Sequence, residues 1–387
     1  MKEYFYKKEY KYIYLSKFCY YFAYTLIETF GTVMLYRNGI PVWLILMIYG
    51  IRFGITGLCT PFFMNISSKF GIAKVILVSN TFSFLASYMM LVTNDLSSKI
   101  VIFIVFMGLL GLSNPAGDAL SSKYVTTETR GRFNAFLNVS KITATALSSI
   151  IVASSIIFNN KIILLVLIAI FFFLDFVFTS QIDYKTKSNG NIFKETFRYI
   201  IKSKSKYKLI YALRANHIIE RLFLPLYIYI LLKDFKMFST VIVISLTFQI
   251  VTIILIGKYT DKNIEKSNKL VSIIKIIITS VFLFIRNKYV VSVNKTLSDN
   301  FDKVYETSIQ TSIQNIIKNS KEDHALMSSV GQMTLCFAEV IVFAILVILA
   351  LFIKEKVLLV IFVFSIISTI LIDVLIHKEN IELKDIN

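Results

Sequence analysis

Long apolar runs are the feature that most restricts how this chain can fold. The segments Ile162–Ser180, Phe337–Ile353 and Val357–Ile376 are almost free of charge. Each is close to the roughly 20 residues that a helix needs to cross the hydrocarbon core of a bilayer. The chain of 387 residues is 56% hydrophobic, whereas a soluble domain is typically about 45–50% apolar. The sequence therefore predicts an integral membrane protein.

The apolar pattern predicts an all-α, polytopic fold of about twelve transmembrane helices in two six-helix halves. The expected spans are 12–36, 41–64, 75–94, 100–122, 133–158 and 162–180, followed by 209–232, 238–257, 270–286, 289–317, 326–353 and 357–377. The predicted domains are an N-terminal bundle (1–180), a basic cytoplasmic linker (181–208) and a C-terminal bundle (209–387). So many spans leave room for short loops only. Asn114-Pro115 predicts a bend in the fourth span, because proline removes a helix hydrogen bond.

The formal net charge of +18 raises the possibility of nucleic-acid binding, but the distribution of the charge argues against it. Most of the 42 Lys and Arg residues fall in loops assigned to one side of the membrane. The positive-inside rule then predicts cytoplasmic N- and C-termini. The basic linker is expected to lie on anionic lipid headgroups, so the lipid bilayer is the expected partner. Cys19, Cys59 and Cys336 are scattered, which predicts buried thiols without a disulfide or metal site.

No small-residue cleavage site follows the first apolar segment, so the first helix is predicted to be retained. The compact chain and the lack of targeting segments favour a multi-pass protein of a cell inner (plasma) membrane. Nothing in the sequence fixes the oligomeric state, and a monomer is assumed.

Two loop motifs resemble those of the major facilitator superfamily. The run Gly257-x-x-x-Asp261-Lys262, with Lys266 following, is similar to a loop signature of that family. The run Glu128-Thr-Arg130-Gly131-Arg132 resembles its junction between helices four and five. The segment that begins at Gly257 aligns with Met64–Gly71, about half the chain length away, as an internal duplication requires.

The resemblance implies a cytoplasmic gate made of Gly257, Asp261 and Lys262, with Arg130 and Arg132 as partners. Asp118, near the cytoplasmic end of the fourth span, is interpreted as a further gate or structural charge. The chain departs from the pattern at Met64, Ser68 and Ile264, which stand where the family has Gly, an acidic residue and Gly. The member is therefore divergent. The alternative is that these segments are ordinary charged turns.

Charged residues inside the spans are unevenly distributed, and each needs a hydrated or paired setting. Spans 1, 4, 7 and 10 carry ten of them: Glu28, Asp118, Arg214, Glu220, Arg221, Lys295, Asp299, Asp302, Lys303 and Glu306. Arg52, Lys141 and Glu339 lie on spans 2, 5 and 11. Spans 3, 6, 9 and 12 together carry three, Asp175, Lys275 and Asp373, which are close enough to the cytoplasmic ends of their spans to be expected to snorkel. The resemblance implies that spans 1, 4, 7 and 10 line a central cavity and that spans 3, 6, 9 and 12 face lipid.

Span 10 carries a polar stripe at helical spacing, in which Lys295, Asp299, Asp302 and Glu306 share one face. This pattern predicts a helix facing a water-filled cavity, and the alternative is an amphipathic helix outside the membrane. On span 7, Arg214, His217, Glu220 and Arg221 also share a face. Pairing among them would lower the insertion penalty with or without transport.

Glu28 and Arg52, near the middle of spans 1 and 2, are candidates for a structural ion pair or for a substrate or proton site. The predicted substrate and coupling residues are Glu28, Arg52, Arg214, His217, Glu220, Arg221, Asp299, Asp302, Lys303 and Glu306. The ten charges of spans 1, 4, 7 and 10 are six acidic and four basic, which favours a cationic or zwitterionic solute.

The leading functional hypothesis is a secondary active transporter that moves a small solute by alternating access. No P-loop is present, so an ion gradient, with protons as the first choice, is expected to supply the free energy. One alternative is a non-transporting scaffold or sensor derived from a transporter. Another is an intramembrane transferase, which three histidines without an HExxH or GxSxG motif disfavour. No catalytic residue, cofactor or metal is expected.

Overall fold

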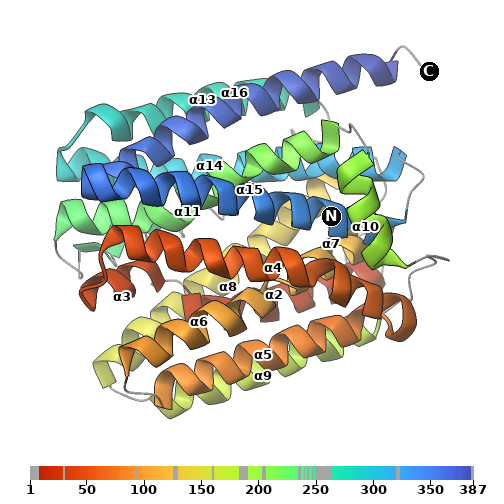
Figure 1. Cartoon of the computed structure of the whole chain (residues 1–387), viewed down its shortest axis with the longest axis horizontal. Helices are drawn as coiled ribbons and strands as arrows, with labels where there is room; N and C mark the ends of the chain where they lie inside the picture. The colour runs from red at the N-terminus through yellow and green to blue at the C-terminus, as the bar shows by residue number, and fades with distance from the viewer. Residues whose placement is uncertain are drawn as a thin grey trace.

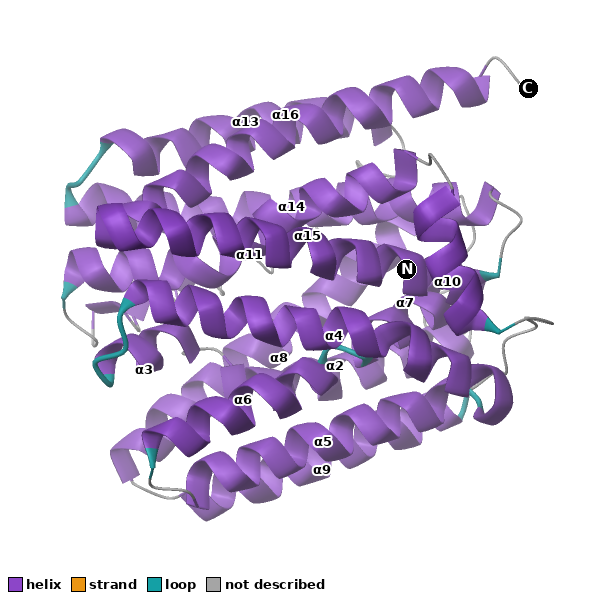
Figure 2. Ribbon diagram, viewed as in Figure 1, coloured by secondary structure: helices purple, strands orange, loops and turns teal. Residues whose placement is uncertain are grey.

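The structure is a computed structural model that describes residues 8–28, 31–92, 95–124, 130–158, 161–182, 191–202, 206–233, 237–238, 240–241, 244–245, 248, 264–319 and 323–384. Within these ranges every regular element is a helix (Figure 2). The first half contains α2 (Lys8–Glu28), α3 (Gly31–Arg37), α4 (Val42–Phe70), α5 (Ile72–Val92), α6 (Leu96–Leu110), α7 (Ser113–Tyr124), α8 (Arg130–Phe158) and α9 (Lys161–Ser180).

The second half follows a short connecting helix, α10 (Ile192–Lys202). It contains α11 (Lys206–Leu232), α13 (Ile264–Phe284), α14 (Lys288–Asn319), α15 (His324–Ile353), the 3₁₀ turn η2 (Lys354–Lys356) and α16 (Val357–Lys384). The predicted spans coincide with these helices to within several residues, except the eighth, most of which lies outside the described residues. The predicted all-α class is confirmed.

The helix boundaries follow from local sequence. Gly39, at φ +83°, supplies the left-handed turn that joins α3 to Pro41 and α4. The Asp95 side chain caps α6 by accepting a hydrogen bond from the backbone N–H of Ser98 at 2.7 Å. That hydrogen bond also lowers the pKa of the Asp95 carboxyl. The fourth predicted span is divided, since α6 ends at Leu110 and α7 begins at Ser113, next to the predicted bend.

The helices lie roughly parallel in one bundle, with the outer helices at two opposite edges (Figure 1). In that view α5 and α9 form one edge, and α13 and α16 form the other. Between them α4 and α15 run side by side along most of their length and join the two halves.

Close packing of α4 on α15 depends on glycine. A methyl group at Gly57 would lie 2.9 Å from Cβ of Cys336, and one at Gly50 would lie 3.0 Å from Cβ of Phe343. Only a residue without a side chain therefore allows the two backbones to approach this closely at Gly57.

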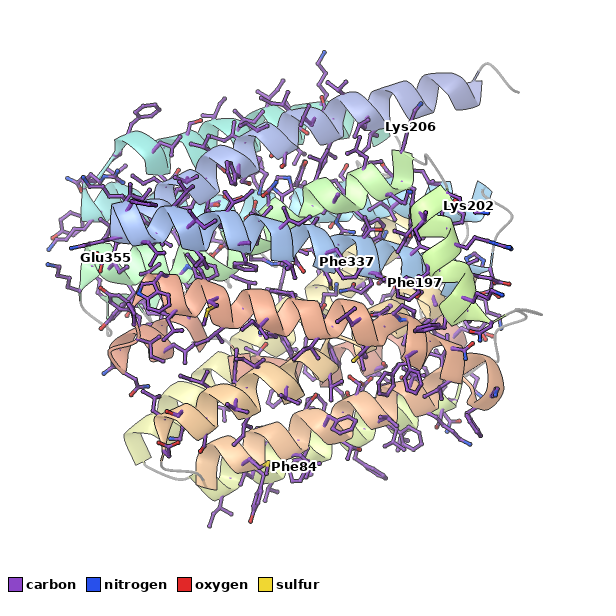
Figure 3. All side chains as sticks on the ribbon, in the orientation of Figure 1. Phe84, Phe197, Lys202, Lys206, Phe337 and Glu355 are labelled. Atoms are coloured by element: carbon purple, nitrogen blue, oxygen red, sulfur yellow. The ribbon has the colours of Figure 1, made fainter. Side chains whose placement is uncertain are left out.

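The connecting helix α10 lies at one end of the bundle, which we call the linker end. The backbone N–H of Ile192 donates to Asn65 Oδ1 on α4 at 3.1 Å, and Thr196 Oγ1 donates to Ser329 on α15 at 3.1 Å. Figure 3 places the labelled Lys202 and Lys206 toward this end and Glu355 at the opposite end. The helix α10 thus bridges the two halves where α4 ends and α15 begins.

Three described stretches are long and apolar enough to cross a membrane, by length and hydropathy alone. They are Val42–Ser67, Lys206–Leu232 and His324–Ile376, the last of which includes both α15 and part of α16. Shorter apolar helices occur at Ile72–Leu85, Leu96–Val105 and Leu165–Ser180.

Candidate solute cavity between the two halves

A cavity of about 380 Å³ lies between the halves. Its described walls come from α2, α3, α4, α7 and α8 of the first half and from α11, α14 and α15 of the second. The described residues of α5, α9, α13 and α16 do not contribute to these walls. The four helices at the outer edges are therefore separated from the cavity by the inner ones.

The described cavity wall carries more basic than acidic side chains. Seven are basic and four are acidic: Lys17, Arg52, Lys141, Arg214, Arg221, Lys295 and Lys303 against Asp118, Asp299, Glu306 and Glu339. Charges that lie between packed helices are tolerated only where water or a counter-charge surrounds them. The cavity is thus a polar, mainly positive compartment within an apolar bundle.

An ion pair between α11 and α14 lies in this wall. Arg221 Nη1 donates to Glu306 Oε2 at 2.8 Å, and Lys303 Nζ reaches the same oxygen at 2.9 Å. The Arg221 side chain is 44% exposed, although it projects from the middle of a helix inside the bundle. One carboxylate therefore holds two cations in an open, water-accessible part of the cavity.

The helix α14 turns its polar face inward. Lys295 and Ser298 are buried, whereas Val293 and Leu297 on the opposite face are 63% and 44% exposed. A helix in water has the reverse arrangement, with its apolar side buried. This arrangement is the one expected of a helix that faces a polar cavity. Lys295 forms an ion pair with Asp299 one turn later on the same polar face.

Arg52 on α4 and Glu339 on α15 bring opposite charges to the contact between the halves. The Arg52 guanidinium lies 5.4 Å from the centre of the Tyr49 ring and 5.3 Å from that of Phe103. Both Arg52 and Glu339 are almost fully buried, and they interact electrostatically. Neither carboxylate oxygen of Glu339 has a nitrogen or oxygen hydrogen-bond partner among the described residues. Glu339 is thus a buried acid of the cavity wall whose carboxylate accepts no N–H or O–H hydrogen bond from the described residues.

Three further cationic side chains of the wall make cation–π contacts with tyrosine rings. Lys141 Nζ lies 4.9 Å from the centre of the Tyr21 ring. Arg214 lies 5.2 Å from that of Tyr211, and Lys17 lies 5.8 Å from that of Tyr20. Such contacts stabilise a cation by about 0.5–2 kcal/mol while leaving its N–H groups able to bind an anion.

Polar contacts join the halves on both sides of the cavity. Toward the linker end, Asn138 Nδ2 donates to Thr307 Oγ1 at 2.7 Å, and Asn134 Nδ2 donates to Gln314 Oε1 at 3.0 Å. Toward the opposite end, Thr32 Oγ1 donates to the Leu222 carbonyl oxygen at 3.3 Å. There the Tyr36 hydroxyl also hydrogen-bonds to Glu355.

The structure brings six of the ten residues predicted for the substrate and coupling site into this wall: Arg52, Arg214, Arg221, Asp299, Lys303 and Glu306. His217, Glu220 and Asp302 lie instead in a buried cluster with Lys275, between α11, α13, α14 and α16. Glu28 ends α2, and its side chain lies outside the described part of the chain.

The predicted gate is only partly described. Asp118, on α7, lines the cavity. Arg130 and Arg132 lie in the first turn of α8, and their side chains are outside the described part of the chain. Gly257, Asp261 and Lys262 lie outside the described residues altogether.

The expectation that Asp175 and Lys275 snorkel to the membrane surface is wrong. Asp175 is 2% exposed and accepts hydrogen bonds from Ser16 at 2.5 Å and from Asn80 at 2.9 Å. Lys275 is 3% exposed. The outer helices turn their few charges inward, because a partner within the bundle offsets desolvation better than lipid does.

Sequence reasoning also missed part of the wall. The predicted substrate and coupling residues do not include Lys17, Lys141 or Glu339, which all line the cavity. A periodic signal was present on the first span, where Lys17, Tyr20, Tyr21 and Tyr24 recur at helical spacing, and all four line the cavity.

Comparisons with known proteins agree with this architecture. The family model described as Major Facilitator Superfamily matches residues 13–293. The human organic anion transporter MFSD10 (TETRAN) has a similar solved structure, with a TM-score of 0.68, 11% identity, and coverage of 96% of this chain and 99% of that one. A bacterial homologue of the iron transporter ferroportin, solved in an outward-facing state, has a TM-score of 0.67 and 12% identity, with coverage of 96% of this chain and 98% of that one. The comparison with curated protein sequences returns no match.

The fold and its polar central cavity define a polytopic helical membrane transporter. The chain belongs to the major facilitator superfamily.

Proposed function

We propose that the protein is a secondary active transporter that moves a small organic anion across the membrane by alternating access. The observation that carries this proposal is the excess of basic over acidic side chains in the wall of the cavity between the halves. In a cavity with walls of low dielectric, surplus fixed cations create a positive potential that favours an anionic ligand. Arg221 supports it further, since its guanidinium is both paired and open to the cavity.

The tyrosine rings of the wall favour an anion with an apolar or aromatic body. Tyr20, Tyr21, Tyr24, Tyr49 and Tyr211 line the cavity beside the basic residues. A ligand pocket of this kind combines apolar contact area with a few charged groups that fix orientation. The carboxylate or sulfonate would bind Arg or Lys, and the body of the solute would pack on the rings.

The structural likeness to MFSD10, an organic anion transporter, agrees with this class of solute. The proposal replaces the sequence-based preference for a cationic or zwitterionic solute. That preference counted Glu220 and Asp302 as cavity residues and omitted Lys17 and Lys141, whereas the described cavity wall contains the two lysines and neither acid.

Alternating access would open the cavity to one side of the membrane at a time. The contacts at Asn138–Thr307 and Thr32–Leu222 are the ones that would break in turn. We propose that a proton gradient drives the cycle. We also propose that the protein lies in the inner membrane of a cell, with the linker end and its basic α10 facing the cytoplasm.

The test is solute exchange by the purified full chain in proteoliposomes. Vesicles loaded with unlabelled benzoate are expected to accumulate labelled benzoate, and citrate is expected to compete less because it lacks a ring. Labelled tetraethylammonium and ferrous iron are the comparison solutes. Exchange of either cation without benzoate would overturn the anion assignment. Lack of exchange for the whole panel would favour the scaffold alternative.

A further inference from the structure

A buried charge cluster lies in the second half, apart from the cavity wall. Lys275 on α13 stands between two carboxylates, 3.2 Å from Glu220 Oε2 on α11 and in direct contact with Asp302 Oδ1 on α14. The side chains of Glu220 and Lys275 are 0% and 4% exposed, and that of Asp302 is 13% exposed. We call these three residues the buried triad.

Polar side chains surround the buried triad on every packed helix. Thr279 donates to Glu220 Oε1 at 3.2 Å, and Ser365 on α16 donates to Glu220 Oε2. His217 Nδ1 lies 3.9 Å from Glu220 Oε2 and 2.9 Å from Ser365 Oγ. Tyr305 Oη lies 3.4 Å from His217 Nε2. The cluster is an organised site with its hydrogen-bond donors aimed at the carboxylates.

The charges of the buried triad do not balance when all three groups are ionised. Two carboxylates face one ammonium, which leaves a net charge of −1 in a desolvated place. The other ionisable groups around it are His217 and Arg214 on α11, Asp299 and Tyr305 on α14, and Asp373 on α16, and the balance of −1 holds with the His217 imidazole neutral. Asp299 has its own partner in Lys295, and Arg214 lies on the cavity side over Tyr211. An unbalanced buried charge is costly, and the usual remedy is a bound proton.

The buried triad and the cavity ion pair share two helices. Glu220 directly precedes Arg221 on α11, and Asp302 lies one turn before Glu306 on α14. An anion that binds Arg221 brings negative charge near Asp302. By electrostatic linkage it strengthens proton binding at the triad, and a proton at the triad strengthens anion binding by the same factor.

We propose that the buried triad is the binding site of the coupling proton, one per cycle, and that Asp302 carries it. The inference rests on the proposed function, because it assigns the site of ion coupling within the same transporter. A hydronium ion transfers a proton to an Asp302 carboxylate oxygen: one O–H bond of the hydronium breaks, one O–H bond forms on Asp302, and a water molecule is left. Lys275 then pairs with Glu220 alone. Release is the reverse transfer, to a water molecule, and it restores the ionised carboxylate.

The first experiment compares two kinds of benzoate flux in proteoliposomes. Exchange at equal pH needs binding and alternating access, whereas accumulation driven by a pH gradient, beyond the passive entry of benzoic acid into protein-free vesicles, also needs the proton site. Asp302→Asn and Glu220→Gln mimic the neutral, protonated triad. Each variant is expected to keep benzoate exchange, whereas its gradient-driven accumulation is expected to be at least tenfold lower than that of the wild type. Asp175→Asn, which neutralises a buried carboxylate in the first half, is the matched control and is expected to keep both.

A double variant separates charge balance from damage to the fold. Lys275→Met combined with Asp302→Asn leaves Glu220 as a single buried acid, able to bind one proton. It is expected to regain gradient-driven accumulation that Asp302→Asn alone has lost. Full accumulation by Asp302→Asn, or equal loss in Asp175→Asn, would overturn the assignment.

A titration of the purified full chain with an indicator dye tests the site without any solute. Between pH 5.5 and about 9, ordinary surface carboxyls have already released their protons. The wild type is expected to release one more proton than Asp302→Asn in this range, and Asp175→Asn is expected to match the wild type. Identical proton release by all three proteins would overturn the site. If benzoate exchange fails in the wild type, the proposed function fails while this titration still decides the proton site.

Discussion

Arg221 and Glu306 form an ion pair across α11 and α14 at 2.8 Å, yet the Arg221 side chain remains 44% exposed. Surface ion pairs of this length contribute little, and buried ones are normally shielded from water. A pair that is at once internal and exposed lies in a water-filled space between helices. It offers an anion a guanidinium whose present partner can be displaced, since Lys303 also holds Glu306 at 2.9 Å.

Arg221→Gln is expected to weaken benzoate binding by about 10- to 100-fold, because a hydrogen bond to a charged group contributes about 1.5–3 kcal/mol. Half-maximal exchange concentration in proteoliposomes measures the change. Arg37→Gln is the matched control, since Arg37 is exposed at the end of α3 and does not line the cavity. Equal exchange by wild type and Arg221→Gln would contradict the role of this residue.

Tyr21→Leu is expected to reduce selectivity for aromatic over aliphatic anions. The substitution keeps an apolar side chain but removes the ring that lies 4.9 Å from Lys141 Nζ. A ring contact contributes about 0.5–1.5 kcal/mol beyond its area, so the benzoate preference should fall about three- to tenfold. The ratio of benzoate to citrate inhibition constants gives the result. A parallel loss for both anions would instead indicate general damage to the cavity.

Gly57→Ala is expected to impair the contact between α4 and α15, because the added Cβ would lie 2.9 Å from Cβ of Cys336. Overpacking of this kind destabilises by about 1–3 kcal/mol. The melting temperature in detergent and the rate of exchange should both fall. The matched control is Gly54→Ala on the same helix, where the nearest atom would lie at an ordinary 3.5 Å. Similar losses in both variants would show that helix flexibility, and not close approach, is what matters.

Asn138→Ala is expected to favour opening at the linker end, since it removes the 2.7 Å hydrogen bond to Thr307 on the other half. A net loss of about 1 kcal/mol corresponds to a roughly fivefold shift in the ratio of molecules open at the linker end to molecules closed there. Spin labels at the exposed positions Lys74 on α5 and Lys269 on α13, in a background without Cys19, Cys59 and Cys336, report the distance between the halves. An unchanged distance distribution would exclude a gating role for this contact.

Much of the fold could be predicted because lipid imposes a simple constraint. A spanning segment must satisfy its backbone internally and present apolar side chains, so length and hydropathy alone locate helices such as α9 and α15. The polar stripe of α14 was visible for the same reason, since Lys295, Asp299 and Glu306 recur at helical spacing. The predicted gate loop around Asp261 remains a prediction, because it lies outside the described residues.

Hydropathy and helical spacing were enough to predict a helical membrane protein, the charged residues within its spans, and those that share a helix face. The partners of these residues became known from the packing of the helices. Hydropathy treats Asp302 and Glu306 alike, yet Asp302 contacts Lys275 in the buried triad and Glu306 meets Arg221 in the cavity. The physical reason is that pairing and hydration depend on which helices lie beside each residue, and local periodicity carries no information about the neighbouring helix.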